Sequence, residues 1–276
     1  MSVSAFFDLD GTLMPMPSLE QRFFSMLRFR KQIGIRNYFF WCMEAVRLIP
    51  GGINRILHAN KMYLRGVRAD VGYGGTDIPV CPRLADEAGE KRKRQARMTV
   101  PLYPEAIERM VWHAERGHLI MIMSGTLEPL AERTARALEA ELRERGFATE
   151  IRVCATRLEK TDGSWTGRIV GEAVFGKAKA RAVRRIASKE NLDLRKCFAY
   201  GDSSSDRWML EAVGKPAAVN PSSDLARIAR RNDWPILHWG KEKTFTQRAR
   251  RARRTQRLDE SNDELQVARA KVGFRI

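Results

Sequence analysis

The sequence has few cysteines and no long apolar run, and each of these absences excludes a type of protein. Only 4 of its 276 residues are cysteine, and they are scattered, with no Cys-x-x-Cys pair. This pattern argues against a zinc site or a disulfide framework and predicts thiols in a reducing, cytoplasmic compartment. The most apolar stretches, residues 37–46 and 119–123, fall short of the roughly 20 residues that a membrane-spanning helix needs. No basic segment precedes the first apolar run, so we expect no signal peptide.

Acidic residues are scarce relative to basic ones. The chain carries 50 Lys and Arg against 33 Asp and Glu, a formal net charge of +17 at pH 7. This excess indicates an anionic partner, and nucleic acid, an anionic membrane and a phosphorylated small molecule all qualify. With 43% hydrophobic and 30% charged residues, the composition excludes a collagenous or wholly disordered chain.

Three short apolar runs each end in a polar cluster that contains glycine. The runs with their clusters are residues 3–12, 119–126 and 197–203. Helical patterns follow the second and third clusters, over residues 128–145 and 206–213. Continuously apolar strands that alternate with helices predict an α/β fold with a doubly wound, Rossmann-like parallel sheet. Ligands bind beyond the carboxyl ends of such strands, so we expect the three clusters to meet at one site.

Two carboxylates stand two residues apart where the first run ends. If the chain stays extended, Asp8 and Asp10 point to the same side, because side chains on a strand repeat every two residues. Asp202 comes from another strand end. Such crowding raises carboxyl pKa values and costs stability unless a cation is present, and ligation by oxygen alone suits Mg²⁺. The alternative is that Asp8 and Asp10 only cap the turn into a helix.

The other clusters offer groups for an anion. Ser124, with the backbone N–H groups of Gly125 and Thr126, would form an anion cradle or, alternatively, an ordinary helix cap. Lys177 stands between a glycine and a helical run, where its ammonium group would reach a phosphoryl oxygen. The loop of residues 201–206 would hold a metal and orient its neighbours, or form a solvated turn.

The long insertion between the first two strands predicts a second domain. We expect a catalytic core over residues 1–17 and 99–240, a helical cap over 18–98, and a basic extension over 241–276. The cap should be helical from residue 19 to 68, with a break at Pro50-Gly51-Gly52. A loop rich in Gly and Pro follows over residues 72–82. Residues 151–153 and 165–170, on either side of Asp162-Gly163, are expected to pair as a hairpin.

In this order the four clusters resemble the haloacid dehalogenase-like superfamily of phosphohydrolases, in its subgroup with a helical cap that includes phosphoserine phosphatase. The first signature, Asp-x-Asp-Gly-Thr, stands at residues 8–12. The second matches at Ser124, the third at Lys177, and the fourth, Gly-Asp-x-x-x-Asp, at residues 201–206. The resemblance covers roughly residues 3–13 and 100–238.

The resemblance implies a role for each matching residue. Asp8 would attack phosphorus and become an aspartyl phosphate, and Asp10 would act as general acid and then as general base. Mg²⁺ would be the cofactor, held by Asp8, the backbone carbonyl of Asp10, and Asp202. The phosphate of the substrate would be held by Ser124, Gly125 and Lys177, with Asp206 and Thr12 in support.

The resemblance thus implies a Mg²⁺-dependent phosphatase that hydrolyses a small phosphomonoester. Two alternatives remain open. One is a phosphotransferase that uses the same aspartyl phosphate, and the other is a protein that binds an anionic membrane or nucleic acid on a phosphatase fold. Nucleic acid is the less favoured partner, because the basic tail run over residues 248–254 contains no aromatic side chain for base stacking.

The cap is where the chain departs from phosphoserine phosphatases, which place a Glu shortly after the first signature. Here Glu20 comes slightly later, which argues against phosphoserine as the substrate. The cap is instead basic and aromatic, with Phe23, Phe39, Phe40 and Trp41. These residues either pack the cap interior or lie on an anionic membrane surface, which would make the protein peripheral to the membrane and a phospholipid headgroup its substrate.

Overall fold

The computed structural model describes residues 2–70 and 101–240. Residues Met1–Trp239 form one compact unit, and Gly240–Ile276 are assigned to another. The predicted Gly- and Pro-rich loop over residues 72–82, which contains Cys81, and the predicted extension over 241–276 lie outside the described residues. The separation of residues 18–98 as a cap domain therefore stays a prediction.

A six-stranded sheet forms the centre of the first unit, in the order β3-β2-β1-β6-β7-β8. All five strand pairings are parallel. The strands are β1 (Ser4–Phe7), β2 (Leu119–Leu127), β3 (Ile151–Thr156), β6 (Phe198–Gly201), β7 (Lys215–Val219) and β8 (Ile236–Leu237). The predicted α/β fold with a doubly wound parallel sheet is confirmed.

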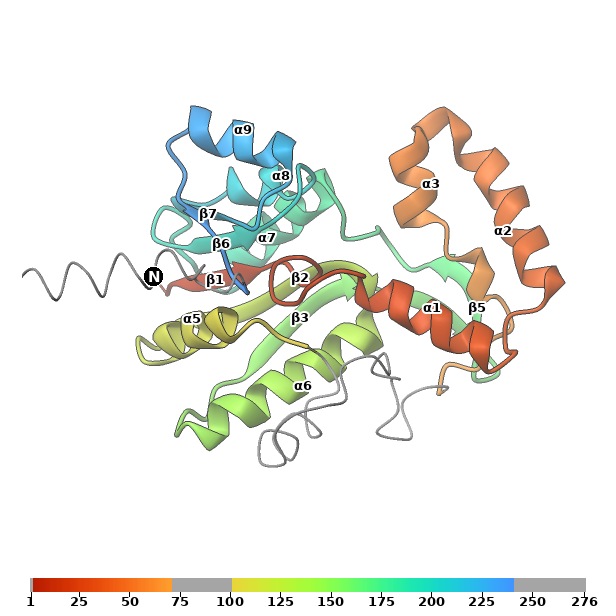
Figure 1. Cartoon of the computed structure of the whole chain (residues 1–276), viewed down its shortest axis with the longest axis horizontal. Helices are drawn as coiled ribbons and strands as arrows, with labels where there is room; N and C mark the ends of the chain where they lie inside the picture. Colours follow the sequence, from red (N-terminus) through yellow and green to blue (C-terminus); the bar gives the residue numbers. More distant parts are fainter. Residues whose placement is uncertain (1, 71–100, 241–276) are drawn as a thin grey trace, which may run out of the picture. The chain divides into compact units, whose positions relative to one another are not determined.

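Helices cover both faces of the sheet (Figure 1). One face carries α5 (Pro104–Ala114) and α6 (Glu128–Glu144). The other carries α7 (Lys177–Lys189), α8 (Arg207–Leu210) and α9 (Ser223–Arg231). Both faces of each central strand are therefore buried, which explains why these strands read as continuous apolar runs.

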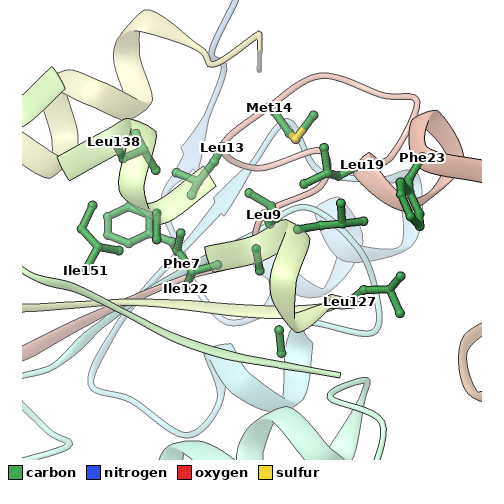
Figure 2. Packing of buried hydrophobic residues seen from close by; sticks show 14 of the residues in the cluster. Phe7, Leu9, Leu13, Met14, Leu19, Phe23, Ile122, Leu127, Leu138 and Ile151 are labelled. Carbon is green, nitrogen blue, oxygen red and sulfur yellow. The ribbon is translucent and has the colours of Figure 1, made fainter. Parts of the chain in front are cut away.

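Neighbouring residues on β1 point into two different cores. Phe7 packs with Ile122, Leu138 and Ile151 on the α5–α6 face, as Figure 2 shows. Phe6, one residue earlier, belongs to the cluster under α7, α8 and α9. The alternation follows from the two-residue period of a strand and holds the carboxyl end of β1 rigidly between two packed layers.

Residues 19–64 form the helical part of the insertion. It consists of α1 (Leu19–Phe29), α2 (Ile35–Leu48), the short 3₁₀ helix η1 (Ile49–Gly51), α3 (Ile53–Ala59) and η2 (Met62–Leu64). A capping box starts α1, where the Ser18 hydroxyl accepts from the Gln21 N–H and the Gln21 side chain accepts from the Ser18 N–H. The predicted break at Pro50-Gly51-Gly52 lies between α2 and α3.

The predicted hairpin has a different partner strand. β5 (Ser164–Ile169) pairs antiparallel with β4 (Leu158–Thr161), whereas residues 151–156 form β3 of the main sheet. Asp162 and Gly163 both have positive φ, 50° and 74°, which is the geometry of a two-residue hairpin turn. A turn this tight pairs only the strands that adjoin it, which excludes residues 151–153. Within the described part of the chain, no helix is both long enough and apolar enough to cross a membrane.

Candidate active site

Strand register brings the sequence clusters to one edge of the sheet. Phe7 on β1 lies opposite Ile122 on β2 and opposite Tyr200 on β6. Asp8 and Asp202, just past the ends of β1 and β6, therefore lie within one or two residues of the level of Ser124, which is still part of β2. The Asp8 N–H continues the pairing by donating to the Tyr200 carbonyl, with a distance of 2.9 Å between nitrogen and oxygen.

Three carboxylates gather at this edge. Ligand oxygens of Asp8, Asp202 and Asp206 all lie within 4.8 Å of one another. The Thr12 hydroxyl donates to Asp202 Oδ1 at 3.3 Å. Gly11 has φ 88°, and a Cβ placed there would lie 2.3 Å from Asp202 Oδ2, so the loop admits Asp202 only because residue 11 has no side chain.

Asp10 is not part of this cluster, which differs from the expectation that its carboxylate joins Asp8 and Asp202. Asp10 Oδ1 accepts a hydrogen bond from the Leu19 N–H, with 2.6 Å between the two atoms. The chain turns after Asp8, so the side-chain alternation of a strand no longer applies. The Asp10 carboxyl is held beside the first residue of α1, and Asp206 provides the third carboxylate of the cluster.

A buried lysine ties the cluster together. Lys179, which is 3% exposed, donates from Nζ to Asp8 Oδ1 and to Asp206 Oδ1, the latter at 2.6 Å. Asp206 Oδ2 accepts from the Ser203 N–H at 3.0 Å and from its hydroxyl at 2.7 Å. Both oxygens of Asp206 are thus satisfied, and the carboxylate fixes the position of Lys179.

The structure places Lys177, the predicted phosphate-binding lysine, away from the carboxylate cluster. Lys177 is exposed, and its ammonium group lies 5.0 Å from the centre of the Trp208 ring. Lys177 is the first residue of α7 and Lys179 the third, so the two side chains leave the helix about 200° apart. Only Lys179 faces the sheet edge.

The charged groups of the cluster shift one another's pKa values. Burial, followed by the charge of Asp206, raises the pKa of Asp8 well above its ordinary value, with Lys179 opposing the rise. The same two causes raise the pKa of Asp202 to about 7. Burial also raises the pKa of Asp206, but Lys179 outweighs it and the net shift is downward. Burial alone would lower the pKa of Lys179, and the charges of Asp206 and Asp8 raise it instead.

These residues fit a hard divalent cation. Three carboxylates and one lysine leave negative charge in a buried site, and Asp8 and Asp202 ionise together more easily with a further positive charge between them. The donors are all oxygen, with neither His nor Cys in the cluster, which is the ligand set that Mg²⁺ prefers.

Ser124 and Gly125 lie at the same edge, but no helix starts there. β2 continues to Leu127 and α6 begins at Glu128, so the predicted cradle at a helix N-terminus is wrong in its local structure. The Ser124 hydroxyl accepts from the Thr126 N–H at 3.1 Å. The Gly125 carbonyl accepts from the Thr156 hydroxyl at 2.9 Å, which anchors the segment to β3.

The insertion places a second polar cluster close to the first. Lys61, 3% exposed, donates to both carboxylate oxygens of Glu20 at 2.6 Å, and the Tyr63 hydroxyl donates to Oε1 at 2.5 Å. His58 stacks on Phe175, just before α7, with ring centres 3.6 Å apart. Burial, then Lys61, lowers the pKa of His58 to about 4, and Lys179 and Asp206 also act on it, so His58 lies near the carboxylate cluster.

Sequence reasoning missed Lys179, His58 and Lys61. A signal for Lys179 was present, because Ala182, Val183 and Ile186 follow it at helical spacings of three, four and seven residues, which puts Lys179 on the apolar face of α7. A lysine on an apolar helix face is a candidate for a buried ion pair. We find no comparable signal for His58 or Lys61, whose positions depend on how the insertion packs.

Comparison with known proteins agrees with this geometry. The family model of the haloacid dehalogenase-like hydrolases matches residues 5–211. A Mycobacterium tuberculosis protein named phosphoserine phosphatase is 30% identical over 248 residues, covering 86% of this chain and 70% of its own length. A second protein of that species, named a probable phosphatase, is 27% identical and covers 86% of this chain and 76% of its own length.

Solved structures show the same fold. A Bordetella pertussis protein of unknown function superimposes with a TM-score of 0.62 at 23% identity, covering 86% of this chain and 98% of its own. A phosphoserine phosphatase in its apo form gives a TM-score of 0.51 at 18% identity, covering 86% and 94%. The shared sheet, the cluster at its edge and the family match over most of the sequence lead to one conclusion: the chain belongs to the haloacid dehalogenase-like hydrolase family.

Proposed function

We propose that this protein is a Mg²⁺-dependent phosphatase that hydrolyses a phosphomonoester through an aspartyl phosphate on Asp8. The observation that carries the proposal is the buried Asp8 carboxylate, held by Lys179 in a cluster of three carboxylates. A carboxylate fixed in this way has its nucleophilic oxygens at the sheet edge where ligands bind in such folds. The lysine next to it favours its ionised form.

In the first step, an Asp8 oxygen bonds to phosphorus and the bond from phosphorus to the leaving oxygen breaks. Asp10 supplies the proton to that oxygen. Burial raises the pKa of Asp10 to about 6, against an opposing hydrogen bond from Leu19, so an appreciable fraction of Asp10 is protonated near neutral pH. In the second step, ionised Asp10 takes a proton from water, which attacks phosphorus, releases phosphate and restores Asp8.

The remaining residues position the phosphoryl group. Mg²⁺, held by Asp8, Asp202 and the Asp10 carbonyl, would offset the repulsion between the carboxylates and the phosphoryl oxygens. Lys179 takes the role first given to Lys177 and donates to a phosphoryl oxygen, with Asp206 as its positioning partner. Ser124 and the Gly125 N–H hold another oxygen, and Thr12 orients Asp202.

The test is hydrolysis of an aryl phosphate by the full chain, with Mg²⁺ and with a chelator. We expect Asp8→Asn to lower kcat by about 10³-fold or more, because it removes the nucleophile. The matched control is Asp224→Asn, an exposed carboxylate on α9 whose loss should leave the rate unchanged. Retention of the rate by Asp8→Asn, or equal rates with chelator, would overturn the proposal. Added alcohols separate hydrolysis from phosphotransfer, because only a transferase makes a new phosphomonoester.

We further propose that the leaving group carries no ammonium near the phosphate. Glu20 is an acidic side chain of the insertion near Asp10, on whose pKa its charge acts. Its carboxylate is already held by Lys61 and Tyr63, and Lys61 is buried. A substrate amine would have to displace a buried ion pair, which is costly. This argues against phosphoserine.

Removing Lys61 tests this substrate class. In Lys61→Met the carboxylate of Glu20 loses its cation, and we expect the ratio of kcat/KM for O-phosphoserine to that for the same ester without its amine to rise by roughly tenfold. The ratio is taken within one variant, so a partial loss of folded protein cancels. Arg68→Met, which breaks the exposed ion pair with Asp70, is the control and should not change the ratio. A wild-type preference for O-phosphoserine would contradict the proposal.

We also propose a cytoplasmic location. Cys42, Cys154 and Cys197 are free thiols, and Cys81 lies outside the described residues. Free cysteines are typical of proteins in reducing compartments, which supports this location.

A further inference from the structure

The outer side of α2 and α3 exposes a row of apolar side chains. Ile35, Phe39, Met43 and Val46 follow one another at helical spacings of four, four and three residues, so they share one face of α2. Ile49 on η1 and Ile53 and Leu57 on α3, the last two four residues apart, are exposed as well. Their exposed fractions are high, between 58% for Met43 and 84% for Ile35. We call these seven side chains the outer apolar row.

The same helices are well anchored on their other side. The Asn37 side chain donates to the carbonyls of Tyr63 and Arg65, and the Asn60 side chain donates to the Trp41 carbonyl. Leu48 is 7% exposed, and Trp41 packs against the core cluster. The row is therefore a fixed surface of a folded helical hairpin, and not a sign that the helices are loose.

The sequence left open whether the aromatic residues of this region pack the cap interior or lie on an anionic membrane surface, and their burial differs from one residue to the next. Phe23 is 1% exposed and packs edge-on against Trp165, so it belongs to the interior. Phe40 and Trp41 are partly buried. Phe39 is 62% exposed. The aromatic residues thus divide between the interior of the cap and its surface.

Exposed basic residues are frequent in the sequence segment that carries the outer apolar row. Residues 28–57 contain six basic side chains and one acid, Glu44. The basic side chains are all exposed, and they are Arg28, Arg30, Lys31, Arg36, Arg47 and Arg55. Of these six, only Arg47 forms an ion pair within the described part of the chain, with Glu44. The surface therefore combines protruding apolar groups with unpaired positive charge.

We propose that the outer apolar row docks on the surface of an anionic lipid bilayer, with α2 and α3 lying in the interface. Aliphatic and aromatic side chains enter the boundary between headgroups and acyl chains, and the arginines meet anionic headgroups. The charge opposes a second copy of this chain as the occupant, because a symmetric contact would bring six cations against six. Nucleic acid satisfies the cations but gives no burial to isoleucine, leucine and valine.

Docking in this way would place the carboxylate cluster close to the membrane. α3 carries both Leu57 of the outer apolar row and His58, which stacks on Phe175 beside α7. One short helix thus separates the docking surface from the site. The inference concerns binding alone and does not depend on the proposed activity.

The test is flotation of the full chain with vesicles. We expect binding to vesicles of phosphatidylglycerol and phosphatidylcholine at low salt, and at least about tenfold weaker binding to phosphatidylcholine alone. Replacing three members of the row together, Ile35→Ser, Phe39→Ser and Ile53→Ser, should weaken binding to the anionic vesicles by at least about tenfold. The control is Val170→Ser, which changes an exposed apolar residue just after β5 and should bind as the wild type does.

A charge variant separates the contribution of the arginines to vesicle binding from that of the apolar side chains. Arg28→Gln with Arg36→Gln should weaken binding to anionic vesicles and reduce its dependence on salt, while thermal unfolding stays unchanged because both side chains are exposed. Absence of vesicle binding at low salt would overturn the proposal. So would equal binding to both vesicle types, or a dimer in solution that the triple serine variant dissociates, since that dimer would mean a second copy covers the row.

Discussion

The carboxylate cluster and the outer face of α2 and α3 use the same kinds of residue in opposite ways. At the sheet edge, the charges of Asp8, Asp206 and Lys179 are buried and bonded to one another. On α2 and α3, the charges are exposed and mostly unpaired, and apolar side chains are exposed beside them. Burial therefore separates the charges of the proposed reactive site from those of the proposed docking surface.

Two lysines on α7, the buried Lys179 and the exposed Lys177, give the largest expected difference between a buried and an exposed charge. Lys179→Met should lower kcat by about 10²–10³-fold, because the phosphoryl group loses a buried donor. It should also destabilise the protein by about 3–5 kcal/mol, since Asp8 and Asp206 lose their shared cation. Lys177→Met should change neither quantity. Rates on an aryl phosphate and urea unfolding midpoints measure both, and equal rates for the two variants would put the phosphate-binding lysine elsewhere.

Two phenylalanines on α1 test the same contrast without charge. Phe23 is 1% exposed and Phe29 is 85% exposed. Phe23→Ala should cost about 3–5 kcal/mol of unfolding free energy, because it leaves a cavity against Trp165. Phe29→Ala should stay within about 0.5 kcal/mol of the wild type. Denaturant unfolding of both variants is the measurement. A large loss for Phe29→Ala would mean that this side chain is covered in solution.

The smallest expected effect concerns a buried histidine and pH. His113 lies between Tyr200 and His118, and burial lowers its pKa to about 3. The unfolded chain takes up a proton near its ordinary pKa of about 6.5, whereas the folded chain does not, so His113 lowers stability as pH falls from about 7 toward 3. Between pH 7 and 5 its contribution amounts to up to about 2 kcal/mol.

Replacing the histidine should remove that dependence. The unfolding free energy of His113→Gln should fall less between pH 7 and pH 5 than that of the wild type, whatever its value at pH 7. Tyr200→Phe keeps the imidazole and removes only its hydroxyl partner, so it serves as the control. Parallel pH profiles for His113→Gln and the wild type would show that this imidazole does not titrate as described.

Residues near strand ends were predictable from the sequence, because parallel strands fix where their carboxyl ends meet. Asp8 and Asp202 come together for that reason, and the position of Ser124 follows from the same register. The α/β fold itself followed from the apolar runs. The expected hairpin partner over residues 151–153 is wrong, because the tight turn at residues 162–163 pairs only the strands that adjoin it.

What the sequence did not show depends on side-chain direction and on packing of the insertion. Lys177 and Lys179 differ by two residues, and only the buried face of α7 distinguishes them. Asp10 left the cluster because the chain turns after β1, which sequence spacing does not reveal. Pairing of Glu20 with Lys61 joins residues 41 positions apart and depends on the path of α1, α2 and α3. Exposure of Phe39 beside buried Phe23 likewise depends on that path.

The hydrogen bond from the Leu19 N–H to Asp10 connects the carboxyl group proposed as general acid to the first residue of α1. A backbone N–H binds a charged carboxylate more strongly than a neutral carboxyl group. In the proposed reaction, the loss and regain of a proton by Asp10 would therefore tighten and then loosen the start of this helix. The same helix carries Glu20. In the proposed reaction, the strength of the hydrogen bond that holds the start of α1 would therefore follow the protonation state of Asp10.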